Sequence, residues 1–136
     1  MSDITTIQLQ EPFFSEKEKV FLELGELSAS LFRYDTGVCA LRLKNSRGQL
    51  IMLPFQGQQI WRCEFEGRDL TMKSMFEKPA MTSDYLSTYG GFLLHCGATA
   101  TGVPSKNDTH PVHGELPNAH YQKAYLQVGH DEGGPF

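Results

Sequence analysis

Residues 60–70, Ile-Trp-Arg-Cys-Glu-Phe-Glu-Gly-Arg-Asp-Leu, decide the fold class of this 136-residue chain. The apolar residues Trp61, Cys63 and Phe65 alternate with charged ones. This period of two is typical of a β-strand that buries one face. The Gly-Arg-Asp sequence at 67–69 then provides residues that favour a tight turn. The stretch therefore predicts a half-buried strand followed by a turn.

The same pattern recurs on both sides of this stretch. Further strands are predicted at residues 20–24, 28–34, 38–44, 50–53 and 121–128. Turn-forming residues lie between them at 35–37 and 45–48. One short helical turn is predicted at 15–19, because Ser15 and Glu18 have the spacing of a capping box. Short strands without a long amphipathic helix predict an all-β antiparallel domain, as a β-sandwich or a barrel.

Length and composition predict one globular domain. Residues 1–19 are interpreted as an N-terminal segment and residues 20–136 as a single β-sandwich domain. Hydrophobic residues make up 40% of the chain and charged residues 21%, which is ordinary for a globular protein. No apolar run approaches the roughly 18–20 residues that cross a bilayer, and the first residues lack the layout of a signal peptide. No membrane partner is therefore expected, and the cytoplasm is the expected location.

Charge argues against a nucleic-acid-binding protein, and cysteine usage argues against a disulfide-rich or zinc-binding protein. The net charge is −4 and the 12 basic residues are scattered, whereas a nucleic-acid domain shows a basic face. Cys39, Cys63 and Cys96 are too widely spaced for a disulfide framework or a paired-cysteine zinc site. We therefore expect no nucleic-acid partner, and we interpret the cysteines as buried free thiols.

The residues with chemical potential gather at 90–118, GGFLLHCGATATGVPSKNDTHPVHGELPN. Residues 91–96 are predicted to form a short buried strand with a long loop on each side. Long irregular loops in a compact domain are often functional. The segment carries His95, His110 and His113. His110 and His113 have two interpretations, as hydrogen-bonding or acid–base groups in a pocket, or as side chains that tie down loops.

A metal site is the alternative chemistry of this segment. His110, His113, Glu115 and His120 are all competent ligands, as in a cupin-like metal barrel. Their spacing fits no zinc pattern, and the usual cupin spacing of two histidines separated by one residue is absent. The sequence therefore predicts no metal and no cofactor, and metal analysis would distinguish the alternative.

Four stretches together resemble the galactose mutarotase-like superfamily, which includes the aldose 1-epimerases. PFQGQQIW at 54–61 followed by FEGRDL at 65–70 resembles an early hairpin of aldose 1-epimerases. GGFLLHCG at 90–97 and VHGELPN at 112–118 resemble the glycine-rich strand end and the His-Gly loop that line the sugar pocket. The resemblance covers roughly residues 20–134.

The resemblance implies a β-supersandwich that binds a monosaccharide in a cleft over one sheet. In active members a histidine is the general acid at the ring oxygen and a glutamate is the general base at the anomeric hydroxyl. His113 matches the histidine that contacts the sugar, and Glu115 stands where the family has an arginine. The expected function is sugar binding with epimerase-like ring opening, or sugar binding without catalysis. The expected sugar-binding residues are His113, His110, Glu115, Asn118 and His95.

The resemblance also predicts that this chain is the N-terminal part of a longer protein. Family members are considerably longer, and their catalytic glutamate lies far toward the C-terminus. The general base is therefore expected to be missing, and no catalytic residue is named. A hairpin begins at Asp131, but no second strand is predicted for it. Unpaired strand edges favour pairing with another chain, so a homodimer through exposed edges is expected.

Overall fold

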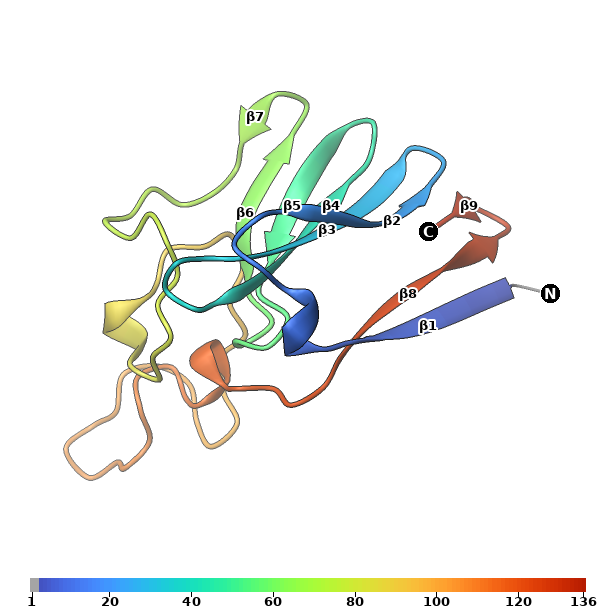
Figure 1. Cartoon of the computed structure of the whole chain (residues 1–136). Coiled ribbons are helices and arrows are strands. Elements are labelled where there is room, and N and C mark those ends of the chain that lie inside the picture. The colour runs from blue at the N-terminus through green and yellow to red at the C-terminus, as the bar shows by residue number, and fades with distance from the viewer. Residues whose placement is uncertain (1–2) are drawn as a thin grey trace.

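The computed structural model describes residues 3–136 and confirms the all-β fold class (Figure 1). These residues contain nine strands in two antiparallel sheets and three short 3-10 turns. No helix in this part of the chain is long and apolar enough to span a membrane.

The larger sheet has six strands in the order of the sequence, each paired with the next. Its strands are β2 (Lys19–Leu24), β3 (Leu27–Arg33), β4 (Cys39–Lys44), β5 (Gly48–Met52), β6 (Ile60–Phe65) and β7 (Arg68–Asp69). The five strands predicted between residues 20 and 65 are thereby confirmed. Tight turns or short loops join them; at 45–48, for example, the Asn45 side chain accepts hydrogen bonds from the backbone N–H of Arg47 and Gly48.

The smaller sheet joins the two ends of the chain. β1 (Asp3–Leu9) pairs with β8 (Ala124–Asp131), and β8 turns back into β9 (Gly134–Pro135). Two features differ from the sequence predictions. No strand was expected before residue 20, and the hairpin at Asp131 does have a short second strand. β1 escaped prediction because the strand that stabilises it lies more than a hundred residues away in the sequence.

The predicted helical turn at 15–19 is wrong. The turn lies earlier, at η1 (Glu11–Phe13), where Pro12 occupies the first turn. The Ser15 hydroxyl donates to the Lys17 carbonyl instead of capping a helix, and the Ser15 carbonyl accepts from the Arg33 backbone N–H. The segment is therefore held beside the end of β3 without forming a helical turn.

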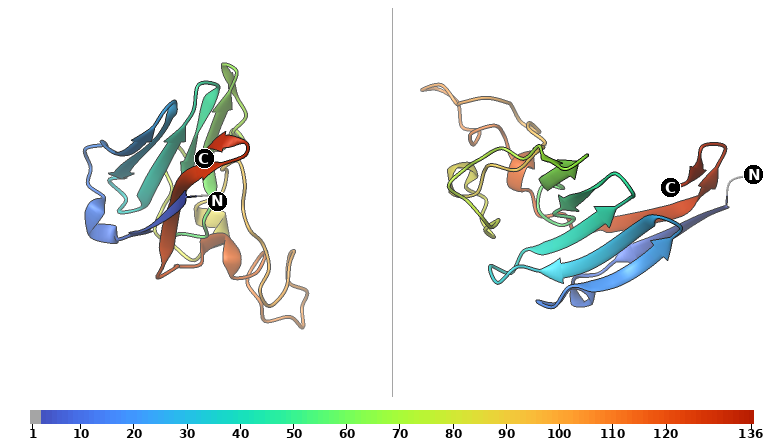
Figure 2. Two further views of the ribbon diagram at one scale, coloured as in Figure 1. Left: turned by 90° about the vertical axis from the view of Figure 1, so that its right-hand side faces the viewer. Right: turned by 90° about the horizontal axis from the view of Figure 1, so that it is seen from above.

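The two sheets pack face to face and enclose the main core. The β1–β8 ribbon runs along one side of the large sheet and carries the start of β1 and the C-terminal end to the same side of the molecule (Figure 2). Buried side chains from both sheets and from the segments that join them meet between the layers. They are Leu9, Phe14, Ala29, Leu31, Cys39, Leu41, Phe55 and Ala124. The alternation along each strand explains why one face of the large sheet supplies this core.

The opposite face of the large sheet carries a second core under an irregular layer. Its buried members are Val38, Ala40, Ile51, Leu53 and Trp61, with Phe76 packed against them. Residues 70–123 form the layer and contain only η2 (Tyr85–Ser87) and η3 (Leu116–Asn118). The predicted buried strand at 91–96 is wrong, because only Leu93 makes a β-bridge, to Ile60, and its side chain is exposed.

Two of the three cysteines are buried in strands of the large sheet, and the third lies in the irregular layer. Cys39 and Cys63 are buried free thiols, as predicted, and burial raises the pKa of Cys39 to about 11. Cys96 is exposed in the irregular layer, so the prediction of a buried thiol is wrong there. The reason is the absence of a strand at 91–96, which leaves the side chain of Cys96 outside any sheet.

Candidate functional site

The candidate site is built on a close crossing of two loop segments. The Gly97 backbone N–H donates to the His113 carbonyl at 2.9 Å, and the Glu115 N–H donates to the Gly97 carbonyl at 3.0 Å. Gly114 lies between them with φ +83°, and a Cβ there would sit 2.2 Å from the Gly97 carbonyl oxygen. Only glycine fits this position, so the His-Gly sequence is a requirement of the crossing.

His113 is held in a strained backbone conformation. Its φ is +62°, in the left-handed region that residues other than glycine seldom adopt. Its N–H donates to the Gly102 carbonyl at 2.8 Å, and its ring packs edge-on against Tyr85 with centroids 4.7 Å apart. Tyr85 in turn stacks on Tyr89. These contacts fix the direction of the imidazole, and such maintained strain is concentrated at functional positions.

Glu115 is a fixed carboxylate. One oxygen accepts the Thr99 backbone N–H at 3.0 Å, and the other accepts the Thr99 hydroxyl at 2.6 Å. These hydrogen bonds lower the pKa of Glu115, so the side chain is ionised at neutral pH. An oriented carboxylate of this kind accepts hydrogen bonds well, but it is a weak base.

Asn118 is oriented by a hydrogen bond from the buried side chain of Gln59. The Gln59 side chain is fully buried, and its Nε2 donates to the Pro117 carbonyl at 2.6 Å and to Asn118 Oδ1 at 2.9 Å. Because both partners are acceptors, the NH₂ group of Gln59 must face them. Its Oε1 has no hydrogen-bond partner within residues 3–136. The amide oxygen of Asn118 is therefore occupied, and its NH₂ group remains as a donor.

Glu115 and Asn118 line an open cleft with a volume of about 560 Å³. The cleft lies between the segment at 81–83, the His-Gly loop and η3. Its lining residues are Gln56, Met81, Thr82, Ser83, Pro111, Glu115, Asn118, Ala119 and His120. This volume falls within the range of small-molecule sites, and the lining combines polar side chains with apolar surface.

The three histidines predicted for the site lie outside the lining of this cleft. His113 packs against Tyr85, as described, and His95 is exposed on the irregular layer. His110 Nδ1 is 2.8 Å from the carbonyl oxygen of Pro111, its neighbour in the chain, and its side chain is only 8% exposed. Of the five predicted residues, the structure brings Glu115 and Asn118 together.

Seven of the nine residues that line the cleft had no sugar-site prediction from the sequence, and Gln56, Ser83 and His120 are among them. Gln56 forms an isolated bridge with His120, and its side chain donates to the Ala80 carbonyl. His120 Nε2 lies 3.6 Å from the Glu11 carboxylate, and Ser83 enters from the segment before η2. Only tertiary pairing brings these positions together, and no local pattern marks them.

The possible metal ligands are dispersed. Within residues 3–136, no group of three or more His, Cys, Asp or Glu side chains is close enough to hold an ion. His110 and His113 turn to Pro111 and Tyr85, and the Glu115 oxygens face Thr99. The cupin-like arrangement therefore finds no support in this geometry.

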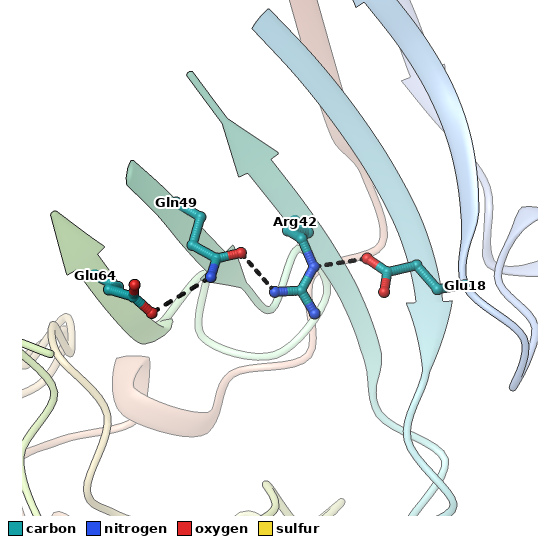
Figure 3. Close-up of polar contacts among 4 residues, drawn as sticks. All are labelled: Glu18, Arg42, Gln49 and Glu64. Carbon is teal, nitrogen blue, oxygen red and sulfur yellow. Dashed lines mark hydrogen bonds and ion pairs between the residues drawn. The ribbon is translucent and has the colours of Figure 1, made fainter. Parts of the chain in front are cut away.

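A second polar cluster crosses the exposed part of the large sheet (Figure 3). Arg42 Nε contacts the Glu18 carboxylate at 2.7 Å, and Arg42 Nη1 donates to Gln49 Oε1 at 2.8 Å. Gln49 Nε2 reaches Glu64 at 3.5 Å, so the row runs from a segment before β2 to β6. Arg42 is paired with Glu18, whereas Glu64 accepts from the neutral Gln49 amide, and we assign this row no ligand.

No family model, no curated protein and no solved structure matches this chain.

Proposed function

We propose that this chain binds a monosaccharide or a sugar derivative in the cleft formed by the His-Gly loop, η3 and the segment at 81–83. The observation that supports the proposal is the convergence of Glu115 and Asn118 on one open volume of about 560 Å³. A sugar offers hydroxyl groups that both donate and accept hydrogen bonds. A fixed carboxylate and a fixed amide NH₂ satisfy these two needs.

The supports behind both groups favour binding. Thr99 holds the Glu115 carboxylate, and Gln59 holds the Asn118 amide, so neither side chain must be ordered when a sugar arrives. Thr82 and Ser83 add hydroxyl groups to the wall, while Met81 and Pro111 offer apolar surface to the C–H faces of a sugar ring. This mixture of groups is typical of small-molecule sites.

Anomer interconversion is the second candidate, and the strained His113 favours it. Ring opening requires a proton donated to the ring oxygen and a proton taken from the anomeric hydroxyl. His113 is the histidine that the family resemblance assigns to the first step, but its ring packs against Tyr85 outside the lining of the cleft. Glu115 is a poor base for the second, because the Thr99 hydrogen bonds lower its pKa. We therefore expect binding, with little or no acceleration of anomer exchange.

Binding is tested by NMR titration of the labelled chain with a panel of monosaccharides, comparing Ser83→Arg with Ser46→Arg. Ser83 lines the cleft, whereas Ser46 is exposed in the turn between β4 and β5. We expect a sugar to shift amide signals around residues 115–120, and Ser83→Arg to weaken that binding about 10-fold or more by filling the cleft. Absence of binding across the panel, or equal binding by both variants, would contradict the proposal.

Catalysis is tested separately by polarimetry of a pure sugar anomer, with and without the protein. The wild-type chain is expected to leave the spontaneous rate nearly unchanged. A marked acceleration that His113→Ala removes would instead support the isomerase alternative.

We also propose that the protein is cytoplasmic. Its three cysteines are free thiols, including the exposed Cys96, and free thiols are usual in a reducing compartment. Localisation of a tagged chain tests this placement.

A further inference from the structure

The sheet edges of this molecule differ in how well they are protected. The large sheet ends at β2 on one side, where a register shift between Val20 and Leu22 disturbs the edge, and at the two-residue β7 on the other. β9 also has only two residues and includes Pro135. Bulges, short strands and proline are the devices by which proteins prevent edge pairing.

β1 has none of these devices. It forms the outer margin of the small sheet, and none of the strands in residues 3–136 lies beyond it (Figure 1). Its seven residues, Asp-Ile-Thr-Thr-Ile-Gln-Leu, pair with β8 without a register shift and include no proline, glycine or lysine. An exposed, regular edge of this length is a template for another strand.

The hydrogen-bonding phase of the ribbon shows which groups face outward. Gly129 exchanges both backbone hydrogen bonds with Phe136, at 3.0 and 2.9 Å, so its N–H and C=O point toward β9. Backbone groups alternate in direction along an antiparallel strand, so Val128 points toward β1 and pairs with Thr5. In β1 the residues that alternate with Thr5 therefore direct their N–H and C=O groups away from β8. They are Ile4, Thr6 and Gln8.

We propose that β1 pairs antiparallel with β1 of a second copy of this chain, about a two-fold axis beside Thr6. This register joins Thr6 to Thr6 and Ile4 to Gln8, and it is the register that pairs all seven residues of β1. The outward N–H and C=O groups of both copies then meet in hydrogen-bonded pairs. The two small sheets become one continuous sheet across the dimer.

The side chains of β1 are self-complementary in this register, which points to a second copy as the occupant. The only charged residue of the strand, Asp3, falls opposite Leu9, so no like charges face each other. Thr5 falls opposite Ile7, and Thr6 opposite Thr6, which are favourable cross-strand pairs. A two-fold interface of this kind closes on itself and produces a dimer.

The test is the mass of the whole chain in solution, measured by sedimentation over a range of concentrations, with a charge exchange at Thr6. The Thr6 side chain is exposed, so Thr6→Lys and Thr6→Glu should both fold, which thermal unfolding verifies. The wild type is expected to form a dimer. Each variant alone places like charges opposite each other and should dimerise about 10-fold or more weakly. An equal mixture of the two should restore the dimer.

Thr109→Lys is the matched control, because it adds the same charge to the exposed loop at the far end of the molecule from β1. It should dimerise like the wild type. A wild-type chain that stays monomeric at every concentration would overturn the proposal. Single variants that dimerise as well as the wild type would also overturn it, because the two-fold axis would then not lie beside Thr6.

Discussion

The two faces of the large sheet are each covered over part of their area, but by different kinds of structure. One face meets the small sheet, and its core comes from regularly spaced side chains such as Ala29, Leu31 and Leu41. The other face meets residues 70–123, an irregular layer that adds Phe76 to a core around Trp61. The small sheet that covers the first face is held together by strand ladders. The irregular layer that covers the second face has almost no regular backbone pairing.

Specific polar contacts replace those ladders in the irregular layer. The buried Thr88 hydroxyl accepts from the Ala80 N–H, and Thr36 donates to the Pro79 carbonyl. Gln59 donates to the Pro117 carbonyl in the same way. The attachment of the irregular layer to the large sheet thus depends on individual side chains. The candidate cleft lies in this loop layer, where binding sites are common.

The largest effect is expected from a cavity between the sheets. Leu41 is 5% exposed in the inter-sheet core, so Leu41→Ala should lower the free energy of unfolding by about 2–5 kcal/mol. Urea denaturation measures this change. Val20→Ala, at a 63% exposed position on the edge strand β2, is the control and should change stability by about 0.5 kcal/mol or less. Equal effects of the two changes would remove the basis for calling this face the main core.

An intermediate effect is expected from the contact that ties η3 to the sheet. Gln59→Ala removes both donors to Pro117 and Asn118 and leaves a buried carbonyl unpaired, at a cost of about 1–3 kcal/mol. Hydrogen exchange should accelerate most at residues 116–119 and least in the inter-sheet strands. Gln58→Ala changes an exposed neighbour and serves as the control. Uniform acceleration in both layers would show that the two faces unfold as one unit.

The smallest effect concerns the Glu115 carboxylate. The Thr99 hydrogen bonds lower its pKa in the folded chain, so this contact is fully formed above the ordinary pKa of a glutamate and is lost as the pH falls through the lowered value. The Thr99 amide signal in NMR should therefore titrate with a midpoint below that of an ordinary glutamate. Glu115→Gln should abolish the titration. A midpoint at or above the ordinary value would contradict the hydrogen bonds between Thr99 and Glu115.

The strands of the large sheet could be predicted because their information is local. Alternation of apolar and polar residues marks each strand between 20 and 65, and glycine, asparagine and aspartate mark the turns. The strand β1 could not be predicted, because Gln127 and Thr6, which hydrogen-bond across the ribbon, are 121 residues apart. Local alternation is weak in β1, and its partner supplies the missing stabilisation.

The candidate site shows the same division. Composition and the His-Gly resemblance drew attention to Glu115 and Asn118, which do line the cleft. The contacts of Gln59 and Tyr85 left no mark in the sequence, although they orient Asn118 and His113. Each of these contacts joins positions that are far apart in the chain.

The amino-acid order alone thus specified an all-β chain, most of its strands and the loops that are rich in chemical groups. Those properties follow from steric and hydrophobic preferences that act over a few residues. The pairing of β1 with β8, the burial of Gln59 and the set of side chains around the cleft emerged from the packed molecule. They depend on contacts between distant segments, which form only when the whole chain closes around its two cores.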